Sequence, residues 1–188
     1  IVQECRRLWA REGHHYSYDD LAEMAARARP FCAFIDPNDP CFLNPADMPA
    51  AIVHFCERTG QQPPQTHGEF VRCALESIAL RYRDVLGKIG QISSRKIAVL
   101  HIVGGGSRNR LLNQFTADAT GVTVVAGPDE ATALGNVLMQ AIASGDLSSV
   151  EEGRAVVRSS AQLEIFEPRE PDRWAEAWQR YCHFVQGQ

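Results

Sequence analysis

The chain has 188 residues, of which 45% are hydrophobic and 22% charged, and its net charge is −4. These values are ordinary for a globular protein and exclude a disordered, collagen-like or fibrous chain. The acidic balance disfavours a broad surface for nucleic acid, and no apolar run approaches the roughly 18 residues of a membrane span. We therefore expect neither nucleic acid nor a membrane as a partner.

The chain begins without methionine, in a charged amphipathic segment that differs from a signal peptide. Residues 1–12 have a helical pattern that starts abruptly, so we expect a fragment of a longer protein. Six cysteines are spread along the chain without a CxxC pair, which favours reduced thiols in a cytoplasmic protein over a zinc or redox motif. No metal site is predicted, and Cys56 and Cys73 are expected to lie close together but reduced.

Residues 1–96 are predicted to be mainly helical. The expected helices cover residues 1–12, 18–29, 48–59 and 67–89. Ser17 offers an N-cap to the second helix, and Thr66 with Glu69 forms a capping box before the fourth. The fourth helix carries an apolar stripe that runs from Phe70 to Val85. The loop DPNDPCFLNP has too many prolines for regular structure.

Residues 97–188 change to an alternation of strands and helices. Strands are expected over 97–103, 122–126 and 162–167, and helices over 108–120, 129–144, from 150 and from 171. The apolar run IAVLHIV predicts a first strand that is buried on both faces of a parallel sheet. Strand, glycine turn and helix then repeat, which indicates an α/β unit with a right-handed crossover. Ala131, Ala133 and Gly135 predict a thin helix face that another backbone can approach.

The strongest functional signal is the triglycine Gly104–Gly106, placed between the first strand and a helix. Glycines let the backbone approach a flat ligand, and the start of a helix supplies unpaired N–H groups. A tight turn without a ligand is the alternative, but three consecutive glycines at the end of a strand favour binding. We expect Arg108 and Arg110, beside the turn, to lie on a solvated helix face and not on a phosphate.

The class of ligand is narrowed by two nucleotide-binding motifs that the glycine turn does not match. A dinucleotide fingerprint needs glycine at its sixth position, where this chain has Asn109, and no acidic residue follows the next strand. The phosphate loop GxxxxGK[ST] is absent from the sequence. The turn is therefore interpreted as a shelf for a nucleoside, with the side chain of Asn109 one turn into the helix.

The stretch HIVGGGSRNRLLNQFTADATGVTVVAGPDEATALGN resembles the adenosine motif of the FGGY carbohydrate kinases. FIDPNDPCFLNP and the early Val2-Gln3-Glu4 are also similar to this family, so the resemblance covers nearly the whole chain. The motif AGP.EA.ALGN is closest to the branch of the family that phosphorylates L-rhamnulose. L-fuculose and xylulose kinases share the glycines but match this motif less well.

The resemblance implies an α/β fold of the ribonuclease H-like, actin-like ATPase class. FGGY kinases have two such domains, with ATP and sugar in the cleft between them. Residues 1–188 would be the C-terminal, ATP-side domain, incomplete at its N-terminal side, with a helical part (1–96) and a nucleotide-binding part (97–188). The resemblance implies that Gly105 contacts adenosine, that Gln3 lies near the nucleotide phosphates, and that Gly106 and Asn109 line the same shelf.

The implied activity is an ATP- and Mg²⁺-dependent transfer of phosphate to a ketose in the cytoplasm, yielding L-rhamnulose 1-phosphate in rhamnose catabolism. The aspartate that acts as general base lies upstream in the family, so no catalytic residue is assigned here and this fragment alone is expected to be inactive. The alternatives are a kinase for another ketose, such as L-fuculose or xylulose, and a non-catalytic actin-like nucleotide-binding domain.

Overall fold

The computed structural model describes residues 1–93 and 96–187, so residues 94–95 of the expected helical part, and residue 188, lie outside the described residues. Its helices are α1 (Val2–Arg11), α2 (Tyr18–Arg27), α3 (Met48–Arg58), α4 (His67–Ser93), α5 (Arg110–Thr120), α6 (Ala131–Ser144), α7 (Val150–Ser160) and α8 (Pro171–Tyr181). Its strands are β1 (Val99–Ile102), β2 (Thr123–Ala126) and β3 (Glu164–Phe166). Every predicted helix and strand is present, most with ends shifted by one to four residues.

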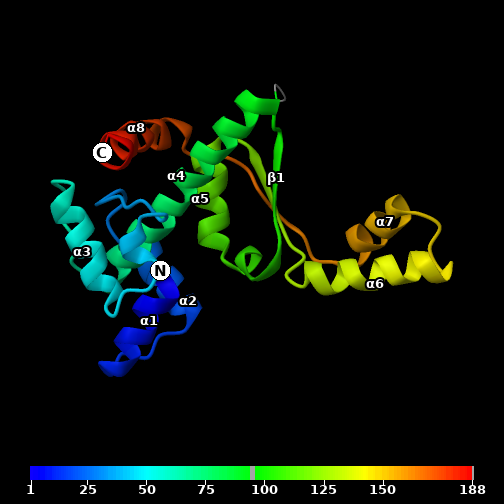
Figure 1. The fold of residues 1–188 in the computed structure, drawn as a ribbon, viewed down its shortest axis with the longest axis horizontal. Coiled ribbons are helices and arrows are strands. Elements are labelled where there is room, and N and C mark those ends of the chain that lie inside the picture. The colour runs from blue at the N-terminus through cyan, green and yellow to red at the C-terminus, as the bar shows by residue number, and fades with distance from the viewer. Residues whose placement is uncertain (94–95, 188) are drawn as a thin grey trace.

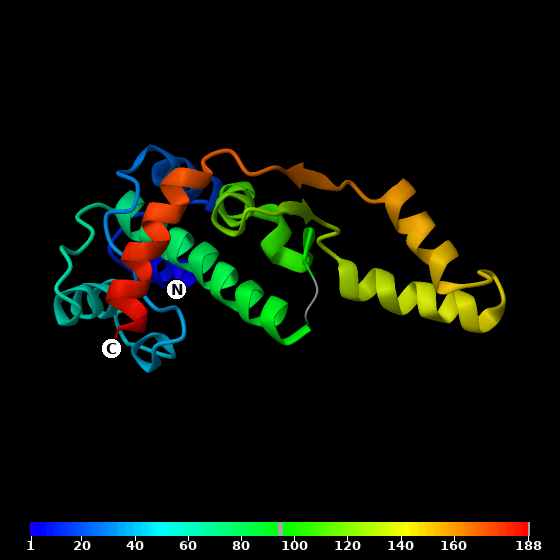
Figure 2. The same ribbon diagram turned by 90° about the horizontal axis from the view of Figure 1, so that it is seen from above.

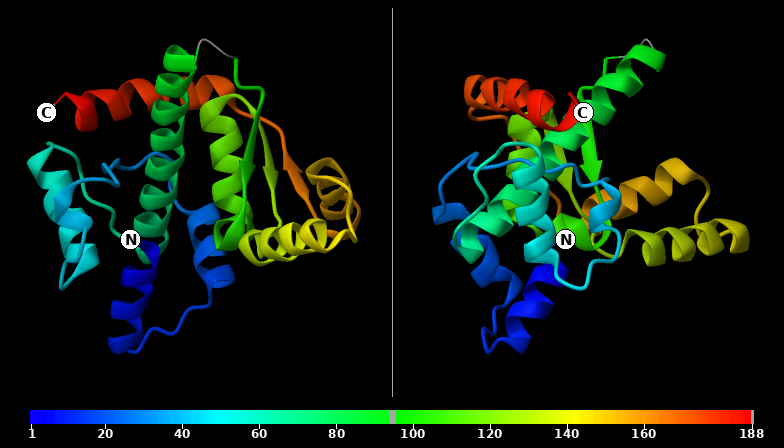
Figure 3. Two further views of the ribbon diagram at one scale, coloured as in Figure 1. Left: turned by 45° about the vertical axis from the view of Figure 1, so that its right-hand side comes forward. Right: turned by 60° about the vertical axis from the view of Figure 1, so that its left-hand side comes forward.

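The long helix α4 runs through the middle of the molecule, between the N-terminal helices and the sheet (Figure 3). Helices α2 and α5 pack along it, and α8 closes the same core. The α8 ring of Trp174 is buried between Phe31 and Phe115, at centroid distances of 5.0 and 5.4 Å. Val85 of the predicted apolar stripe is exposed, because the far end of α4 extends beyond the helices that cover its start.

A buried ion pair on α4, between Arg72 and Glu76, also bonds to the end of α2 and to the chain that follows it. Arg72 Nε lies 2.6 Å from Glu76 Oε1, and Arg72 Nη1 donates to the carbonyls that end α2, those of Ala25 and Ala28 among them, at 3.1 Å. The other oxygen of Glu76 accepts from the backbone N–H of Phe31 at 2.8 Å. The carboxylate thereby satisfies both the guanidinium and the chain that leaves α2.

The sheet has the order β1-β2-β3, with β1 parallel to β2 and β3 antiparallel to β2. Helix α5 connects the parallel pair and packs on α4, so the predicted α/β unit is confirmed. The prediction that 97–103 is buried on both faces is wrong: Val99 and Val103 are 43% and 53% exposed. Strand β1 is the edge of the described sheet, so one of its sides has no neighbouring strand.

Helices α6 and α7 form a hairpin that projects from the rest of the molecule (Figures 1 and 2). They pack against each other, and no residue of α6 is buried even though the helix is rich in apolar side chains. The predicted thin face is therefore not packed against another backbone, since a Cβ at Gly135 would meet no atom within 4 Å.

Candidate functional site

The triglycine forms a short 3₁₀ turn, Gly104–Arg108, at the carboxyl end of β1. Gly104 has a φ of +74° and donates its N–H to Pro128 O at 3.0 Å, so this first glycine is the one that needs left-handed backbone. Gly105 and Gly106 are exposed, and a Cβ built on Gly105 would meet no atom within 4 Å. Gly105 therefore presents bare backbone to open space, as the shelf interpretation requires.

Two side chains that were not predicted as site residues stabilise this turn by hydrogen bonds to its carbonyl groups. Ser107 Oγ donates to Gly104 O at 2.7 Å, and Asn113 Nδ2 donates to Ser107 O at 2.7 Å. Asn113 lies fully buried on α5, and its Oδ1 has no hydrogen-bond partner among the described residues. The sequence offered one sign of this role, because Asn113 is a polar residue on the inner face of a predicted helix, near the start of that helix.

Asn109 lies directly before α5 as its N-cap, not one turn inside the helix as predicted. Its Oδ1 accepts from Leu112 N at 3.0 Å, which satisfies one of the free donors at the start of the helix. The 3₁₀ turn extends through Arg108, the first residue of the expected helix, so α5 begins two residues later, at Arg110. With Oδ1 committed to the cap, Asn109 offers a ligand its amide nitrogen, on a half-buried side chain beside Gly106.

A second turn, Gly127-Pro128, lies against the glycine turn, and Gly127 donates its N–H to Ile102 O at 2.8 Å. Arg108 donates from Nε and Nη2 to Asp129 Oδ2 at 2.8 and 2.5 Å, and this guanidinium lowers the pKa of Asp129. Arg110 Nε lies 3.2 Å from Glu164 Oε2, so each of the two arginines beside the turn forms an ion pair. Both side chains remain exposed, as expected, but carboxylates and not water alone are their partners.

The two turns border a hollow of about 420 Å³. Its lining includes Ser107 and Arg108 from the first turn, Gly127 and Pro128 from the second, and Gln162 from the approach to β3. Gly127 has a φ of +107°, and a Cβ there would lie 2.9 Å from Gln162 O, so only glycine fits. The described residues therefore place polar backbone and an open cavity together at the carboxyl end of the parallel strands.

Gln3, the fourth predicted site residue, is separate from this turn. It lies on α1 and lines a hollow of about 330 Å³ with Arg6, Arg7, His15 and others. Arg6 Nε donates to Tyr16 O at 2.6 Å, which fixes the loop after α1 beside this hollow. The structure thus gathers Gly105, Gly106 and Asn109 in one turn and leaves Gln3 in the N-terminal helical part.

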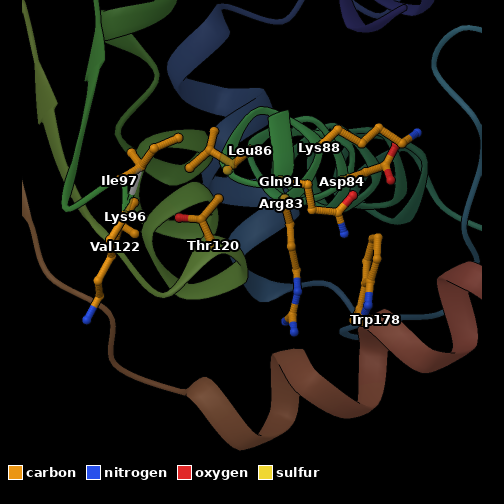
Figure 4. A pocket seen from close by; sticks show the side chains of 12 residues that line it. Arg83, Asp84, Leu86, Lys88, Gln91, Lys96, Ile97, Thr120, Val122 and Trp178 are labelled. Carbon is orange, nitrogen blue, oxygen red and sulfur yellow. The ribbon is translucent and has the colours of Figure 1, made fainter. Parts of the chain in front are cut away.

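Another hollow, of about 540 Å³, lies elsewhere, between the end of α4, the end of α5 and α8 (Figure 4). It contains none of the predicted site residues. Among the described residues, no group of three or more His, Cys, Asp or Glu side chains could hold a metal ion, and no helix is long and apolar enough to cross a membrane.

Residues 1–144 match the sequence model of the C-terminal domain of the FGGY family of carbohydrate kinases. The chain belongs to the FGGY family. Among curated FGGY relatives, a rhamnulokinase of Bacteroides thetaiotaomicron is 46% identical over 98% of this chain and 36% of its own length. One from Bacillus subtilis is 44% identical over 92% of the chain and 35% of its own length. The chain thus spans about a third of the length of these relatives.

Solved FGGY structures share the fold. The glycerol kinase of Plasmodium falciparum with ADP aligns with 95% of this chain and 36% of its own, with a TM-score of 0.65 and 13% identity. The xylulose kinase of Rhodospirillum rubrum covers 96% of this chain and 36% of its own, with a TM-score of 0.58 and 21% identity. The predicted fold class, the actin-like ATPase domain of FGGY kinases, is therefore confirmed.

Proposed function

We propose that this chain is the ATP-side part of a rhamnulokinase, which converts ATP and L-rhamnulose into ADP and L-rhamnulose 1-phosphate in the cytoplasm. The sugar assignment is supported by curated rhamnulokinases that are 37–46% identical to the chain. The observation that carries the nucleotide assignment is the glycine turn, because Gly105 leaves bare backbone open at the carboxyl end of a parallel strand.

In this proposal adenosine lies against Gly105 and Gly106, and the amide nitrogen of Asn109 donates to it. Ser107 and Asn113 keep the turn in shape, so the shelf is formed before the nucleotide arrives. The phosphates extend toward the side of the cleft that contains Gln3. Mg²⁺ would bind the phosphates and neutralise part of their charge.

The division of labour within the kinase is also a proposal. Residues 1–188 supply the nucleotide side, and the base that accepts the proton of the sugar hydroxyl comes from outside these residues. Positioning and charge neutralisation supply most of the rate enhancement in phosphoryl transfer, so a nucleotide shelf without a base contributes binding and not turnover. A kinase for L-fuculose or xylulose is the alternative within the same family.

Substituting Gly105 tests the nucleotide site. Gly105→Val in the full-length protein places a branched side chain where adenosine should lie, and we expect a loss of about thirty- to a hundredfold in ATP affinity, roughly 2–3 kcal/mol. Gly105→Ala should give a smaller loss. Because Gly105 is not left-handed and its Cβ would meet open space, both variants should keep their melting temperature.

Calorimetric titration with ATP and steady-state kinetics with L-rhamnulose, L-fuculose and xylulose separate the parts of this proposal. The KM of the sugar should change little in Gly105→Val. A folded Gly105→Val protein with wild-type ATP affinity would refute the nucleotide site. Preferred turnover of xylulose or L-fuculose would refute the sugar assignment and leave the nucleotide site standing.

A further inference from the structure

The second half of α4 carries an apolar stripe on its outer side. Tyr82, Val85, Ile89 and Ile92 are spaced by three, four and three residues, so they lie on one face of the helix. We call these four residues the outer stripe. They are between 38% and 87% exposed. An apolar stripe with this spacing is typical of a helix face that packs against another element, and the described residues leave it largely uncovered.

The outer stripe faces away from the 540 Å³ hollow and from α8. None of its residues lines that hollow, whereas Arg83, Gly87 and Gln91 of the same helix do. Ile89 and Gln91 point to nearly opposite sides of α4, because an α-helix turns by about 100° per residue. Helix α8, which borders the hollow, therefore does not cover the stripe.

Strand β1 has an outer edge without the usual protection. Within the described residues it pairs only with β2. Natural edge strands are commonly blunted by charged residues or proline, which discourage the addition of a further strand. The residues of β1, Val99–Ile102, include no lysine, no proline and no acidic residue. An edge of this kind is typical of a strand that has a neighbour on both sides.

The outer stripe and the free edge of β1 lie at the same end of the molecule. Ile92, the last residue of the stripe, precedes Val99, the first residue of β1, by seven positions. Figures 1 and 3 show the far end of α4 beside the start of β1. Leu86 of α4 and Ile97, just before β1, line the same hollow, so the helix lies close to the approach to the strand. A strand added at the free edge is therefore within reach of the outer stripe.

The length of the relatives favours one occupant for this surface. The chain spans about a third of the length of the rhamnulokinases it matches, so most of such a protein lies outside the matched region. A segment of the same polypeptide meets a surface at an effective concentration that reaches the millimolar range. A second copy of the chain competes only when the protein itself is similarly concentrated.

We propose that the free edge of β1 and the outer stripe of α4 bind a β-strand from the part of the full-length protein outside residues 1–188. The strand pairs with β1 through main-chain hydrogen bonds, and apolar side chains at alternate positions on that side of the sheet cover the stripe. Because β1 leads directly into Gly104, the added strand also holds the glycine turn from its second side. The proposal concerns assembly of the protein and does not rest on the proposed kinase activity.

Thiol labelling of the full-length protein tests whether the stripe is covered. Ile89→Cys and Gln91→Cys are made separately, treated with N-ethylmaleimide under native conditions, and compared by peptide mapping. We expect Ile89→Cys to react at least about a hundredfold more slowly than Gln91→Cys, since the reagent must wait for local opening. Equal labelling rates at the two positions would show a free surface and refute the proposal.

A charged substitution gives a second, independent readout. Ile89→Lys in the full-length protein buries an unpaired ammonium group, so its melting temperature should fall by at least about 5 °C. Gln91→Lys is the matched control and should melt within about 1 °C of the parent, as expected of an exposed site. Equal melting temperatures for the two variants would contradict a buried stripe. If Ile89→Lys does not fold, the cysteine variants still decide the question.

Amide-resolved hydrogen exchange tests the added strand itself. A strand paired on one side exchanges alternate amides quickly, whereas a strand paired on both sides protects them all. We expect every amide of 99–102 to be protected in the full-length protein. Rapid exchange of alternate amides would overturn the strand even if the stripe is covered. Protection of Ile89→Cys that appears only at concentrations where ultracentrifugation detects a dimer would identify a second copy as the occupant and overturn the proposal.

Discussion

Asn113 shows how one buried amide can shape an exposed binding surface. Its Nδ2 holds the carbonyl of Ser107 from inside the protein, while its Oδ1 is buried without a partner among the described residues. An unsatisfied buried oxygen costs roughly 1–3 kcal/mol, so the side chain is poorly optimised for stability alone. This cost is consistent with a role in positioning the turn.

We predict that Asn113→Leu separates these two effects. The change removes the hydrogen bond to Ser107 and also the unsatisfied oxygen, so stability should change by less than about 1 kcal/mol. ATP affinity should nevertheless fall several-fold because the glycine turn loses its support. Chemical denaturation and ATP titration of the full-length protein measure the two quantities. Ser107→Ala should have a similar effect, and the double variant little more; wild-type ATP affinity in both would contradict the positioning role.

Glu76 predicts a pH dependence of stability. Burial raises the pKa of this carboxyl from 4.5 to about 7, although Arg72 and the N–H of Phe31 favour its charged form. The folded protein therefore retains a proton between pH 4.5 and 7 that the unfolded chain has released. The protonated Glu76 carboxyl therefore stabilises the folded state fully below pH 4.5, and this stabilisation is lost as the pH rises through 7.

The comparison with Glu76→Gln isolates this group, since glutamine does not titrate. Between pH 5 and 8 the wild type should lose up to about 3 kcal/mol of unfolding free energy relative to Glu76→Gln. Urea denaturation at several pH values measures this difference. Parallel pH profiles for the two proteins would show that Glu76 is already ionised in the folded state at pH 5.

The glycine shelf and Asn109 were predicted from local sequence, whereas the role of Gln3 came from the family resemblance alone. The openness of Gly105 and the position of Asn109 near the helix start follow from neighbouring residues in the chain. The support by Asn113 and the pairing of Arg108 with Asp129 depend on contacts across turns, which no spacing rule encodes. The left-handed backbone of Gly104 is likewise set by its contact with the second turn, where its N–H donates to Pro128 O.

At the level of elements, helical periodicity and glycine stops predicted α1 to α8 well, because each helix contains its own signal in sequence. Burial was less predictable. The apolar run of β1 indicates an inner strand, but burial depends on neighbours, and the described sheet supplies only β2. The start of α6 was misplaced by two residues because Asp129 and Glu130 form a turn ahead of it.

The packing of α3 and α4 into one core bears on the thiols. Cys56 and Cys73 are both fully buried and free. Burial raises the pKa of Cys73 well above its usual value, and the neighbouring thiols of Cys56 and Cys32 raise it further. Burial raises the pKa of Cys56 to about 12. We predict that neither reacts with a thiol reagent in the native chain, since the thiolate is the reactive form.

Thiol titration of the freshly purified 188-residue chain checks this expectation. After denaturation without a reductant, all six cysteines of this sequence should react. A count of four would indicate a disulfide. Modification of Cys56 or Cys73 before unfolding, located by peptide mapping, would contradict the burial of this pair.

For the molecule as a whole, the proposed division of labour predicts weak binding without turnover. The 188-residue chain should bind ATP with an affinity well below that of the full-length protein, because one wall of a cleft buries only part of the ligand. It should not phosphorylate L-rhamnulose. Calorimetry and a coupled ADP assay test both statements, and sustained ADP release that requires the sugar would overturn the assignment of the base to residues outside this chain.

The exposed hairpin of α6 and α7 determines which part of the chain unfolds first. Its apolar side chains, such as Val137 and Met139, remain 63% and 57% exposed, so unfolding it sacrifices little buried surface. Local opening is least costly where few apolar contacts are lost. A protease added in small amounts should therefore cut within 131–160 first and leave the α4 core intact. The amide hydrogens of α6 should likewise exchange with solvent deuterium long before those of α4.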